Sequence, residues 1–358
     1  MRVIISAGGT GGHIYPALAI LKKIKEMEPQ SEFLYIGTHN RMEKDIVPKH
    51  NIPFKSIEIY GFSKSLKANF KTIKKFLNAY KECKKIITEF KPDVVIGVGG
   101  YVTGPVIYAA SKLGVKTFIH EQNSIPGKCN KFLSKYVDMI GVSMKSSLNA
   151  FPHDKVHFTG NPCSEEALKM PAAPKKEFGL TEDKKLVYIV MGSLGSSAIT
   201  EKLKNSIKLF QDKNYEVMFV TGKDSYDDIK ELNIPSNVKI FPYVESQARI
   251  MKKADLVVTR CGASTLAEII SLKLPSILIP SPYVPNNHQY INGMDFVNKH
   301  AGVMIEEKDL TGEKLVKTID SLINDDKILK EMKENLADLG VDDSATRIYE
   351  LLKKLTEE

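Results

Sequence analysis

The sequence predicts two α/β domains, each built on a doubly wound parallel sheet. At 358 residues the chain is long enough for two domains with separate cores. Apolar strand-like runs alternate with helical patterns, which is typical of parallel sheets covered on both faces. Each half also opens with a strand that leads into a glycine-rich loop, at Gly8–Gly12 and at Gly192–Ser196. Because ligands bind such sheets at the carboxyl ends of the strands, we expect a substrate in the cleft between the halves.

Short apolar runs set the order of the predicted strands. In the first half they are Val3–Ser6, Phe33–Ile36, Lys55–Ile59, Val94–Val98, Thr117–His120 and Met139–Val142. In the second half they are Leu186–Met191, Val217–Val220, Lys239–Tyr243, Leu256–Thr259, Ser276–Ile279 and Val303–Ile305.

The domain boundaries follow from this repeat of the pattern. We expect an N-terminal domain over 1–162 and a C-terminal domain over 163–340. The segment Met170–Lys176, rich in proline and charge, is interpreted as lying at the domain connection. The last part, 341–358, contains a helix over Ser344–Lys354 that is expected to return to the first domain.

Composition excludes several classes of protein. Hydrophobic residues make up 42% and charged residues 26%, as in ordinary globular proteins. No apolar run approaches the ~20 residues of a membrane span, and the N-terminus is interpreted as a first strand, not a signal peptide. The four cysteines are scattered without a C-x-x-C pair, which favours reduced thiols in the cytoplasm and argues against a zinc site.

The net charge of +8 favours anionic partners such as lipid headgroups or phosphorylated substrates. Nucleic acid is the weakest of these, because no basic stretch with interleaved aromatics matches a known readout module. Between Lys64 and Lys91 there are nine lysines against Glu82 and Glu89, and apolar residues recur every three or four positions. This amphipathic basic helix either packs on its own sheet with a solvated lysine face or rests on anionic headgroups, and both can hold at once.

The first glycine loop, Gly8–His13, is the most informative segment. Four glycines in five positions let backbone N–H groups approach a ligand without Cβ obstruction, and the helix that follows makes this an anion or polar-ligand site. The alternative is an ordinary tight turn with a surface histidine. A dinucleotide fingerprint is excluded because Ile14 occupies the third glycine position and no acidic residue ends the second strand. A P-loop is excluded because no Gly-Lys-Ser/Thr follows, so neither NAD binding nor ATP hydrolysis is expected.

An ordered set of motifs resembles the MurG family of peptidoglycan glycosyltransferases over essentially the whole chain. In the first half the motifs are Gly8–His13, Gly99–Pro105, His120–Asn123 and Gly160–Pro162. In the second half they are Gly192–Ser193, Arg260–Glu268 and Asn286–Gln289.

The resemblance implies the two-domain GT-B fold and a step in cell-wall synthesis. The reaction would be an inverting transfer of N-acetylglucosamine (GlcNAc) from UDP-GlcNAc to the C4 hydroxyl of the sugar in undecaprenyl-linked lipid I, giving lipid II and UDP. The N-terminal domain would hold the lipid acceptor at an anionic membrane surface, and the C-terminal domain would hold UDP-GlcNAc. The protein would then be peripheral, on the cytoplasmic face of the cell membrane, and would need no cofactor and no metal, since no Asp-x-Asp motif is present.

The family motifs also assign residues. His13 is the expected base, because it is titratable and lies on a loop that faces the cleft, and Glu121 is the alternative. The residues expected to bind substrate are Thr10, Gly11, Gly12, Tyr101, Asn123, Ser164, Gly192, Ser193, Val244, Gly262, Ala263, Ser264, Thr265, Glu268, His288 and Gln289.

Most of these residues are expected to contact the donor, UDP-GlcNAc. Gly192–Ser193 and Gly262–Thr265 should offer helix-start amides and hydroxyls to the diphosphate. Glu268 should accept both ribose hydroxyls, unless it is only a first-turn acid favoured by the helix dipole. Val244 would flank the uracil, and the donor sugar would be bound by Asn123 and Gln289, with His288 beside Gln289.

Three departures from the family pattern stand out. Cys163-Ser164 replaces an arginine that usually follows Gly-Asn-Pro, and helix-start amides, Lys128 or Arg260 are possible substitutes. Leu194 replaces a polar residue, and His288 stands where some relatives have glutamine. The alternative functions are another UDP-sugar glycolipid glycosyltransferase, a UDP-GlcNAc 2-epimerase, and a non-catalytic UDP-GlcNAc-binding membrane module.

Overall fold

The computed structural model describes residues 1–61, 66–192 and 195–357, with the backbone alone for 66–71. The chain forms two compact units. Unit 1 comprises Met1–Cys163 together with Asp343–Glu358, and unit 2 comprises Ser164–Asp342. The chain passes between them inside helix α6 (Pro162–Lys169) and again after Asp342.

Unit 1 contains a seven-stranded parallel sheet in the order β3-β2-β1-β4-β5-β6-β7. This confirms the predicted doubly wound arrangement, because β1 lies inside the sheet and the chain winds outward from it in both directions. All six predicted strands are present, and the prediction missed β7, a half-buried edge strand of three residues. The strands are β1 (Arg2–Ala7), β2 (Glu32–Thr38), β3 (Phe54–Ile57), β4 (Val94–Gly99), β5 (Lys116–Glu121), β6 (Met139–Val142) and β7 (Val156–Phe158).

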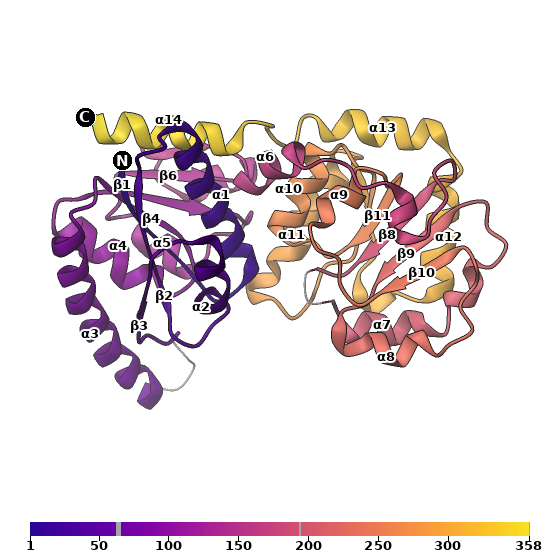
Figure 1. Cartoon of the computed structure of the whole chain (residues 1–358), viewed down its shortest axis with the longest axis horizontal. Coiled ribbons are helices and arrows are strands. Elements are labelled where there is room, and N and C mark those ends of the chain that lie inside the picture. Colours follow the sequence, from indigo (N-terminus) through magenta and orange to yellow (C-terminus); the bar gives the residue numbers. More distant parts are fainter. Residues whose placement is uncertain (62–65, 193–194, 358) are drawn as a thin grey trace. The chain divides into compact units, whose positions relative to one another are not determined.

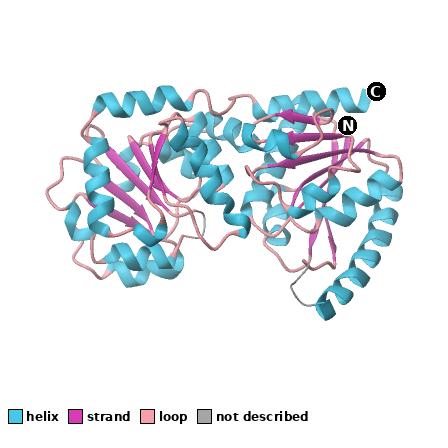
Figure 2. Cartoon of the chain, turned by 180° about the vertical axis from the view of Figure 1, so that it is seen from behind, coloured by secondary structure: helices cyan, strands magenta, loops and turns pink. Residues whose placement is uncertain are grey.

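Helices cover both faces of this sheet (Figure 2). Side chains alternate along β1, so Val3 and Ile5 pack on one face with α1 while Ile4 packs on the other with α3 and α4. Two apolar cores result, one on each face of the sheet. The helices of unit 1 are α1 (Gly11–Met27), α2 (Glu43–Ile46), α3 (Leu66–Phe90), α4 (Thr103–Lys112), α5 (Lys128–Leu133) and α14 (Ser344–Glu357), with 3-10 turns at Val47–His50 and Lys145–Ala150.

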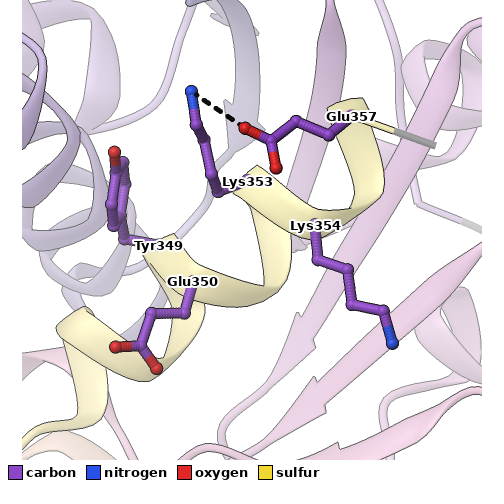
Figure 3. A pocket seen from close by; sticks show the side chains of 5 residues that line it. All are labelled: Tyr349, Glu350, Lys353, Lys354 and Glu357. Atoms are coloured by element: carbon purple, nitrogen blue, oxygen red, sulfur yellow. Dashed lines mark ion pairs between the residues drawn. The ribbon is translucent and has the colours of Figure 1, made fainter.

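The C-terminal helix α14 packs beside α1, although their sequence positions are far apart (Figure 1). Its apolar residues Ile348, Leu352 and Leu355 join the core that contains the buried face of α1. At its polar edge the Glu28 carboxylate accepts hydrogen bonds from the Tyr349 hydroxyl, 3.0 Å, and the Lys353 ammonium, 3.2 Å. A shallow hollow on α14 is lined by charged side chains and Tyr349 (Figure 3), and none of these residues belongs to the predicted site.

The long helix α3 carries apolar residues on two sides. Ala79 and Cys83 are buried among the residues that pack toward α4, whereas Ile73 and Leu77 are 48% and 53% exposed. The helix therefore packs on its own unit with one side and presents a second apolar strip to solvent. Among the described residues, no helix has a stretch long and apolar enough to cross a bilayer.

Unit 2 contains a six-stranded parallel sheet in the order β10-β9-β8-β11-β12-β13, again wound outward from its first strand. The six strands predicted for this half are all present, with ends that differ from the prediction by at most two residues. The strands are β8 (Leu186–Val190), β9 (Glu216–Val220), β10 (Val238–Phe241), β11 (Leu256–Thr259), β12 (Ser276–Leu278) and β13 (Gly302–Met304). The helices are α7 (Ser197–Lys204), α8 (Lys223–Lys230), α9 (Gln247–Met251), α10 (Ala263–Ser271), α11 (His288–Asn298), α12 (Gly312–Ile323) and α13 (Asp326–Leu336), with 3-10 turns at Lys175–Phe178, Ile207–Phe210, Pro285–Asn287 and Glu307–Asp309.

The interpretation of 170–176 as the domain connection is wrong. The segment lies within unit 2, where Ala173 is fully buried and its N–H donates to the Arg249 carbonyl at 3.0 Å. Proline marks the lack of regular structure here, but the small alanine between the prolines packs into the unit. The crossing itself occurs earlier, inside the regular helix α6.

Candidate functional site

The loops that follow β1 and β4 meet at the carboxyl edge of the unit 1 sheet. The Gly8 N–H donates to the Gly99 carbonyl at 3.2 Å. A Cβ at Gly100 would lie 2.4 Å from the Gly8 carbonyl oxygen, and Gly100 has a φ of +86°. Only glycine satisfies both conditions, so the two glycine motifs of the first half form one packed unit.

His13 lies in the first turn of α1, against the second of these loops. Its Nδ1 is 3.1 Å from the Gln122 Oε1 atom. A Cβ at Gly99 would lie 2.5 Å from that same nitrogen, so the ring occupies space that only a glycine leaves. Thr10 is the N-cap residue of α1 and makes no capping hydrogen bond with its side chain. Thr10 and Gly12 are exposed and Gly11 is half-buried, so the helix-start amides are available to a polar ligand.

No motif or spacing in the sequence indicates the buried acid that supports this loop. Glu43, on α2, is fully buried. Its carboxylate accepts hydrogen bonds from the Gly9 N–H, 3.1 Å, the Thr38 N–H, 3.0 Å, and the Thr38 hydroxyl, 2.6 Å. Glu43 thus reaches the glycine loop from a position five residues after the end of β2. A dinucleotide-binding fingerprint instead has its acidic residue at the end of that strand.

Glu121 shapes the neighbouring loop. Its side chain is 2% exposed and accepts four hydrogen bonds. One oxygen takes the N–H and the side-chain amide of Asn123 at 3.0 and 3.2 Å, and the other takes the Gly127 N–H and the Asn130 amide, both at 2.9 Å. This arrangement positions Asn123, and the four hydrogen bonds occupy the acceptor positions of the Glu121 carboxylate.

The other two predicted residues at this end of the chain differ in access. Tyr101 is half-buried, directly after the Gly99–Gly100 turn. Ser164, placed by the structure in unit 2, is buried, and its hydroxyl donates to the Val341 carbonyl at 3.4 Å. The hydroxyl is therefore used inside the fold and is not presented as a phosphate ligand.

In unit 2, the loop between β8 and α7 resembles the first glycine loop in having glycines with positive φ and close contact with neighbouring backbone. Gly192 and Gly195 have φ values of +82° and +75°. A Cβ at Gly195 would lie 2.4 Å from the Thr221 carbonyl oxygen, so the loop presses against the end of β9. Ser193 and Leu194 lie outside the described residues.

Arg260 contacts this loop through Ser196 and is already paired with an acidic residue. It is buried, and its guanidinium is 2.6 Å from the Glu307 carboxylate. It also donates to the carbonyls of Ile279 and Pro280, both at 3.3 Å, and to the Ser196 hydroxyl at 3.0 Å. The suggestion that Arg260 replaces the missing family arginine is therefore wrong, because its Nη1 and Nη2 groups are already engaged within unit 2.

The start of α10 offers the clearest anion-binding features of unit 2. Gly262 is its N-cap residue and Ala263 its first, buried residue. Ser264 and Thr265 are half-buried in the first turn. The Ser264 hydroxyl oxygen is inaccessible to solvent and has no hydrogen-bond partner among the described residues. A hydroxyl in that state beside helix-start amides is well suited to a bound anion.

Glu268 lies further along the same helix. It has neither a hydrogen-bond donor nor an ion-pair partner for its carboxylate among the described residues, and burial raises its pKa to about 7. The pKa of the neighbouring Tyr188 is raised well above its usual range, by burial and then by the charge of Glu268. Glu268 is half-buried, so it is a partly desolvated carboxyl, with acceptor sites vacant among the described residues, and not the exposed first-turn acid considered from the sequence.

The remaining donor-site residues lie on two other loops of unit 2. Val244 is buried just after β10. The His288 Nδ1 is 2.9 Å from the Pro285 carbonyl, and the Gln289 Oε1 accepts the Ser281 N–H at 2.8 Å. A carbonyl only accepts, so His288 donates through Nδ1, and the Gln289 side chain is left with its N–H groups to offer.

Metal binding has no structural support in the described parts of either unit, where no three His, Cys, Asp or Glu side chains gather closely enough to hold an ion. The positive ends of α7 and α10 instead supply the partial charges that an anionic group would meet.

Family models match both halves of the chain. The glycosyltransferase family 28 N-terminal domain matches residues 3–142, and the glycosyltransferase family 28 C-terminal domain matches residues 186–348. A Bacillus cereus protein named UDP-N-acetylglucosamine–N-acetylmuramyl-(pentapeptide) pyrophosphoryl-undecaprenol N-acetylglucosamine transferase 1 is 47% identical over 361 residues, covering 99% of each chain. The transferase of the same name from Bacillus subtilis is 45% identical with the same coverage.

Solved structures give the same picture. The crystal structure of Acinetobacter baumannii MurG matches with a TM-score of 0.79 and 27% identity, covering 99% of each chain. The calicheamicin glycosyltransferase CalG4 matches with a TM-score of 0.72 and 11% identity, covering 100% of this chain and 98% of its own. A putative UDP-N-acetylglucosamine 2-epimerase from Listeria monocytogenes also has a TM-score of 0.72, at 15% identity, covering 99% of this chain and 96% of its own, so these last two show the fold alone.

Proposed function

Because this chain belongs to glycosyltransferase family 28, we propose that it transfers GlcNAc from UDP-GlcNAc to lipid I, giving lipid II and UDP. The resemblance read from the motifs, and the GT-B fold that it implied, are confirmed by these relatives. The observation that carries the activity is the 47% identity over the full length of a transferase whose name gives this donor and this acceptor. The assignments of individual residues below are our own proposals.

The acceptor side of the reaction falls to unit 1. The acceptor's C4 hydroxyl attacks the anomeric carbon while UDP leaves on the opposite face, so the hydroxyl needs a base. We assign this role to His13, which lies beside exposed helix-start amides and, among the described residues, has a hydrogen-bond partner at Nδ1 alone. Glu121 we assign to the loop that positions Asn123.

The donor side falls to unit 2. The helix starts at α7 and α10, with the Ser264 hydroxyl, which has no partner in the described part of the chain, would neutralise the diphosphate as it leaves. Glu268 would accept the two ribose hydroxyls, since its carboxylate has vacant acceptor sites. Val244 would flank the uracil, and Gln289, with His288 beside it, would bind the sugar hydroxyls. In this arrangement the backbone amides, and not a cation, neutralise the charge of the diphosphate, so we expect activity without a metal ion.

A patch on unit 1 has the chemistry of a membrane interface. Ile73, Leu77 and Phe132 project as exposed apolar side chains from α3 and α5. Behind them the Tyr108 ring contacts the ring of Phe132, at 6.2 Å between centroids. Tyr108 also contacts Tyr80 at 5.6 Å and Tyr136 at 5.1 Å.

Lysines surround this patch. Lys74, Lys81, Lys131 and Lys135 are exposed, and Lys112 lies over the rings of Tyr108 and Tyr136. Each lysine near anionic lipid contributes about 1 kcal/mol. We therefore propose that unit 1 binds peripherally to the anionic cytoplasmic face of the membrane, where an undecaprenyl-linked acceptor is accessible.

Vesicle sedimentation tests the membrane proposal. Replacing Ile73, Leu77 and Phe132 with serine should weaken binding to phosphatidylglycerol vesicles at every salt concentration. Replacing Lys74, Lys81, Lys131 and Lys135 with glutamine should weaken it only at low salt, since screening removes their contribution. The control is Tyr283→Ser, at an 80% exposed position of unit 2. Equal binding by all variants would refute the patch.

The transferase assay tests the activity. Purified protein is incubated with radiolabelled UDP-GlcNAc and a lipid I analogue in the presence of EDTA, and label is followed into lipid. Transfer would support the donor, the acceptor class and metal independence together. UDP-GlcNAc bound without transfer would favour the non-catalytic module, and transfer from UDP-galactose or UDP-glucose in preference would favour another glycolipid glycosyltransferase. Conversion of UDP-GlcNAc without any lipid would favour an epimerase.

A further inference from the structure

A buried row of polar groups connects the end of β7 to His13, entirely within unit 1. The His120 Nε2 is 3.0 Å from the Gly160 carbonyl oxygen. The Gln122 Nε2 is 3.0 Å from the His120 Nδ1 and 3.0 Å from the Val98 carbonyl oxygen. The Gln122 Oε1 is 3.1 Å from the His13 Nδ1, which completes the row. Gln122 is 1% exposed, so no bulk water competes for its amide.

The far end of the row fixes where the protons lie on His120. The Gly160 carbonyl can only accept, so His120 must donate through Nε2. Burial lowers the pKa of His120 to about 4, so its ring is neutral near pH 7 and Nδ1 carries a lone pair.

The Gln122 amide is then oriented without ambiguity. The Gln122 Nε2 faces three acceptors, the His120 Nδ1, the Val98 carbonyl and the His120 carbonyl at 3.1 Å, and only the NH₂ side of the amide can donate. The amide oxygen therefore faces His13, and an amide oxygen accepts.

From this row we infer that Gln122 is a positioning residue that holds His13 in the tautomer with the proton on Nδ1, leaving Nε2 as the bare nitrogen. The inference deepens the proposed function, since it states which atom of the proposed base takes the acceptor's proton. Gly99 contributes the space, because its missing Cβ lets the His13 ring approach Gln122. Tautomer selection by a buried hydrogen-bond partner is a strong effect, and loss of the correct tautomer can cost on the order of 10⁴ in kcat in a catalytic triad.

Histidine ¹⁵N NMR tests the tautomer directly and does not depend on activity. The chain has eight histidines, so His13→Asn identifies the His13 signals by their disappearance. At a pH high enough that the spectrum no longer changes, we expect His13 to show a protonated Nδ1 and a pyridine-type Nε2. A protonated Nε2 in the wild-type protein would overturn the inference outright, with no variant needed.

Two variants of Gln122 separate the acceptor from the packing. Gln122→Met keeps the volume and removes the acceptor, so His13 should change to a mixture of tautomers. Gln122→Glu keeps an acceptor toward His13 and should retain the proton on Nδ1. The control, Thr159→Val, removes a hydroxyl 3.2 Å from the His120 Nε2 but leaves the Gly160 carbonyl, so the tautomer should not change. An unchanged His13 spectrum in Gln122→Met would overturn the inference.

Measurements of kcat then test whether His13 is the base, independently of its tautomer. Gln122→Met should lower kcat on the order of 10²-fold with little change in the KM for UDP-GlcNAc, because the residues proposed to bind the diphosphate, the ribose and the uracil lie in unit 2. Thr159→Val should keep most of its activity. A shifted tautomer with normal turnover would support the role of Gln122 and refute His13 as the base.

Discussion

The Glu268 carboxyl should make unit 2 less stable at high pH, and Glu268→Gln should reverse this. Burial raises its folded pKa to about 7, against 4.5 for the unperturbed group. The folded state therefore binds the proton more strongly than the unfolded state. Below the unfolded pKa both states are protonated, so the carboxyl does not lower the free energy of unfolding. As the pH rises from there to about 7 the unfolded state ionises first, and the free energy of unfolding falls.

The pKa difference sets the magnitude. A shift of roughly 2.5 units at about 1.4 kcal/mol per unit corresponds to about 3 kcal/mol. Glutamine has the same shape and does not ionise, so the variant should match the wild type near pH 4 and be about 3 kcal/mol more stable at pH 8. For a unit of this size that is a rise in Tm of roughly 5–10 °C.

Calorimetry of the ligand-free protein across this pH range measures the effect. The two units need not unfold together, so hydrogen exchange of the β8 and β11 amides assigns the transition that moves. The matched control is Glu331→Gln on α13, an exposed position in the same unit. A difference from the wild type that does not depend on pH would refute a desolvated, ionising carboxyl at 268.

The same substitution tests the proposed contact with the ribose. Losing a charged acceptor of two hydroxyls costs about 1.5–3 kcal/mol, so the KM for UDP-GlcNAc should rise roughly 10- to 100-fold while kcat falls less. In the wild type, that KM should rise as the pH falls below about 7, because the neutral carboxyl accepts less well, and Glu268→Gln should lose this dependence. A collapsed kcat with an unchanged KM would place Glu268 elsewhere.

Three further predictions follow from the two sites. His13→Ala should lower kcat by roughly 10²–10⁴ with little change in the KM for UDP-GlcNAc, and a loss below threefold in steady-state assays would remove it as the base. Gly99→Ala should cost on the order of 10²-fold in kcat, because its Cβ displaces the His13 ring; a crystal structure with the ring unmoved would contradict this. Arg260→Met should destabilise unit 2 by about 3–5 kcal/mol in urea unfolding by leaving Glu307 buried and unpaired, and adding Glu307→Leu should recover most of that loss. Equal stability of the single and double variants would refute the pairing.

The fold was predictable because buried parallel strands are short runs of apolar residues. The apolar run Leu186–Met191 predicts a buried strand, and the structure has β8 there with all of Leu186–Val190 buried. Val156–Phe158 escaped recognition because an edge strand of three half-buried residues has no such run. The segment 170–176 was misplaced because proline content reports irregular backbone, and irregular backbone can pack within a unit as well as between units.

The site was predictable only in part. Glycines at Gly8–Gly12 and at Gly192–Gly195 are visible as a pattern because close backbone approach requires that residue type. The same pattern does not indicate that Arg260 forms an ion pair with Glu307, or that Glu121 already accepts four hydrogen bonds. Both residue types are equally consistent with a free functional group until their neighbours are known.

By itself, the sequence determined the doubly wound fold, the family and the positions of the glycine loops, because apolar periodicity and residue type are local properties. Tertiary structure alone decided which polar groups are free and which are engaged. Glu43 and Gln122 reach the glycine loop and His13 from 34 and 109 residues away in sequence, and no local pattern encodes such a hydrogen bond. The pKa of Glu268 has the same origin, since desolvation depends on everything that packs around the carboxyl and not on its neighbours in the chain.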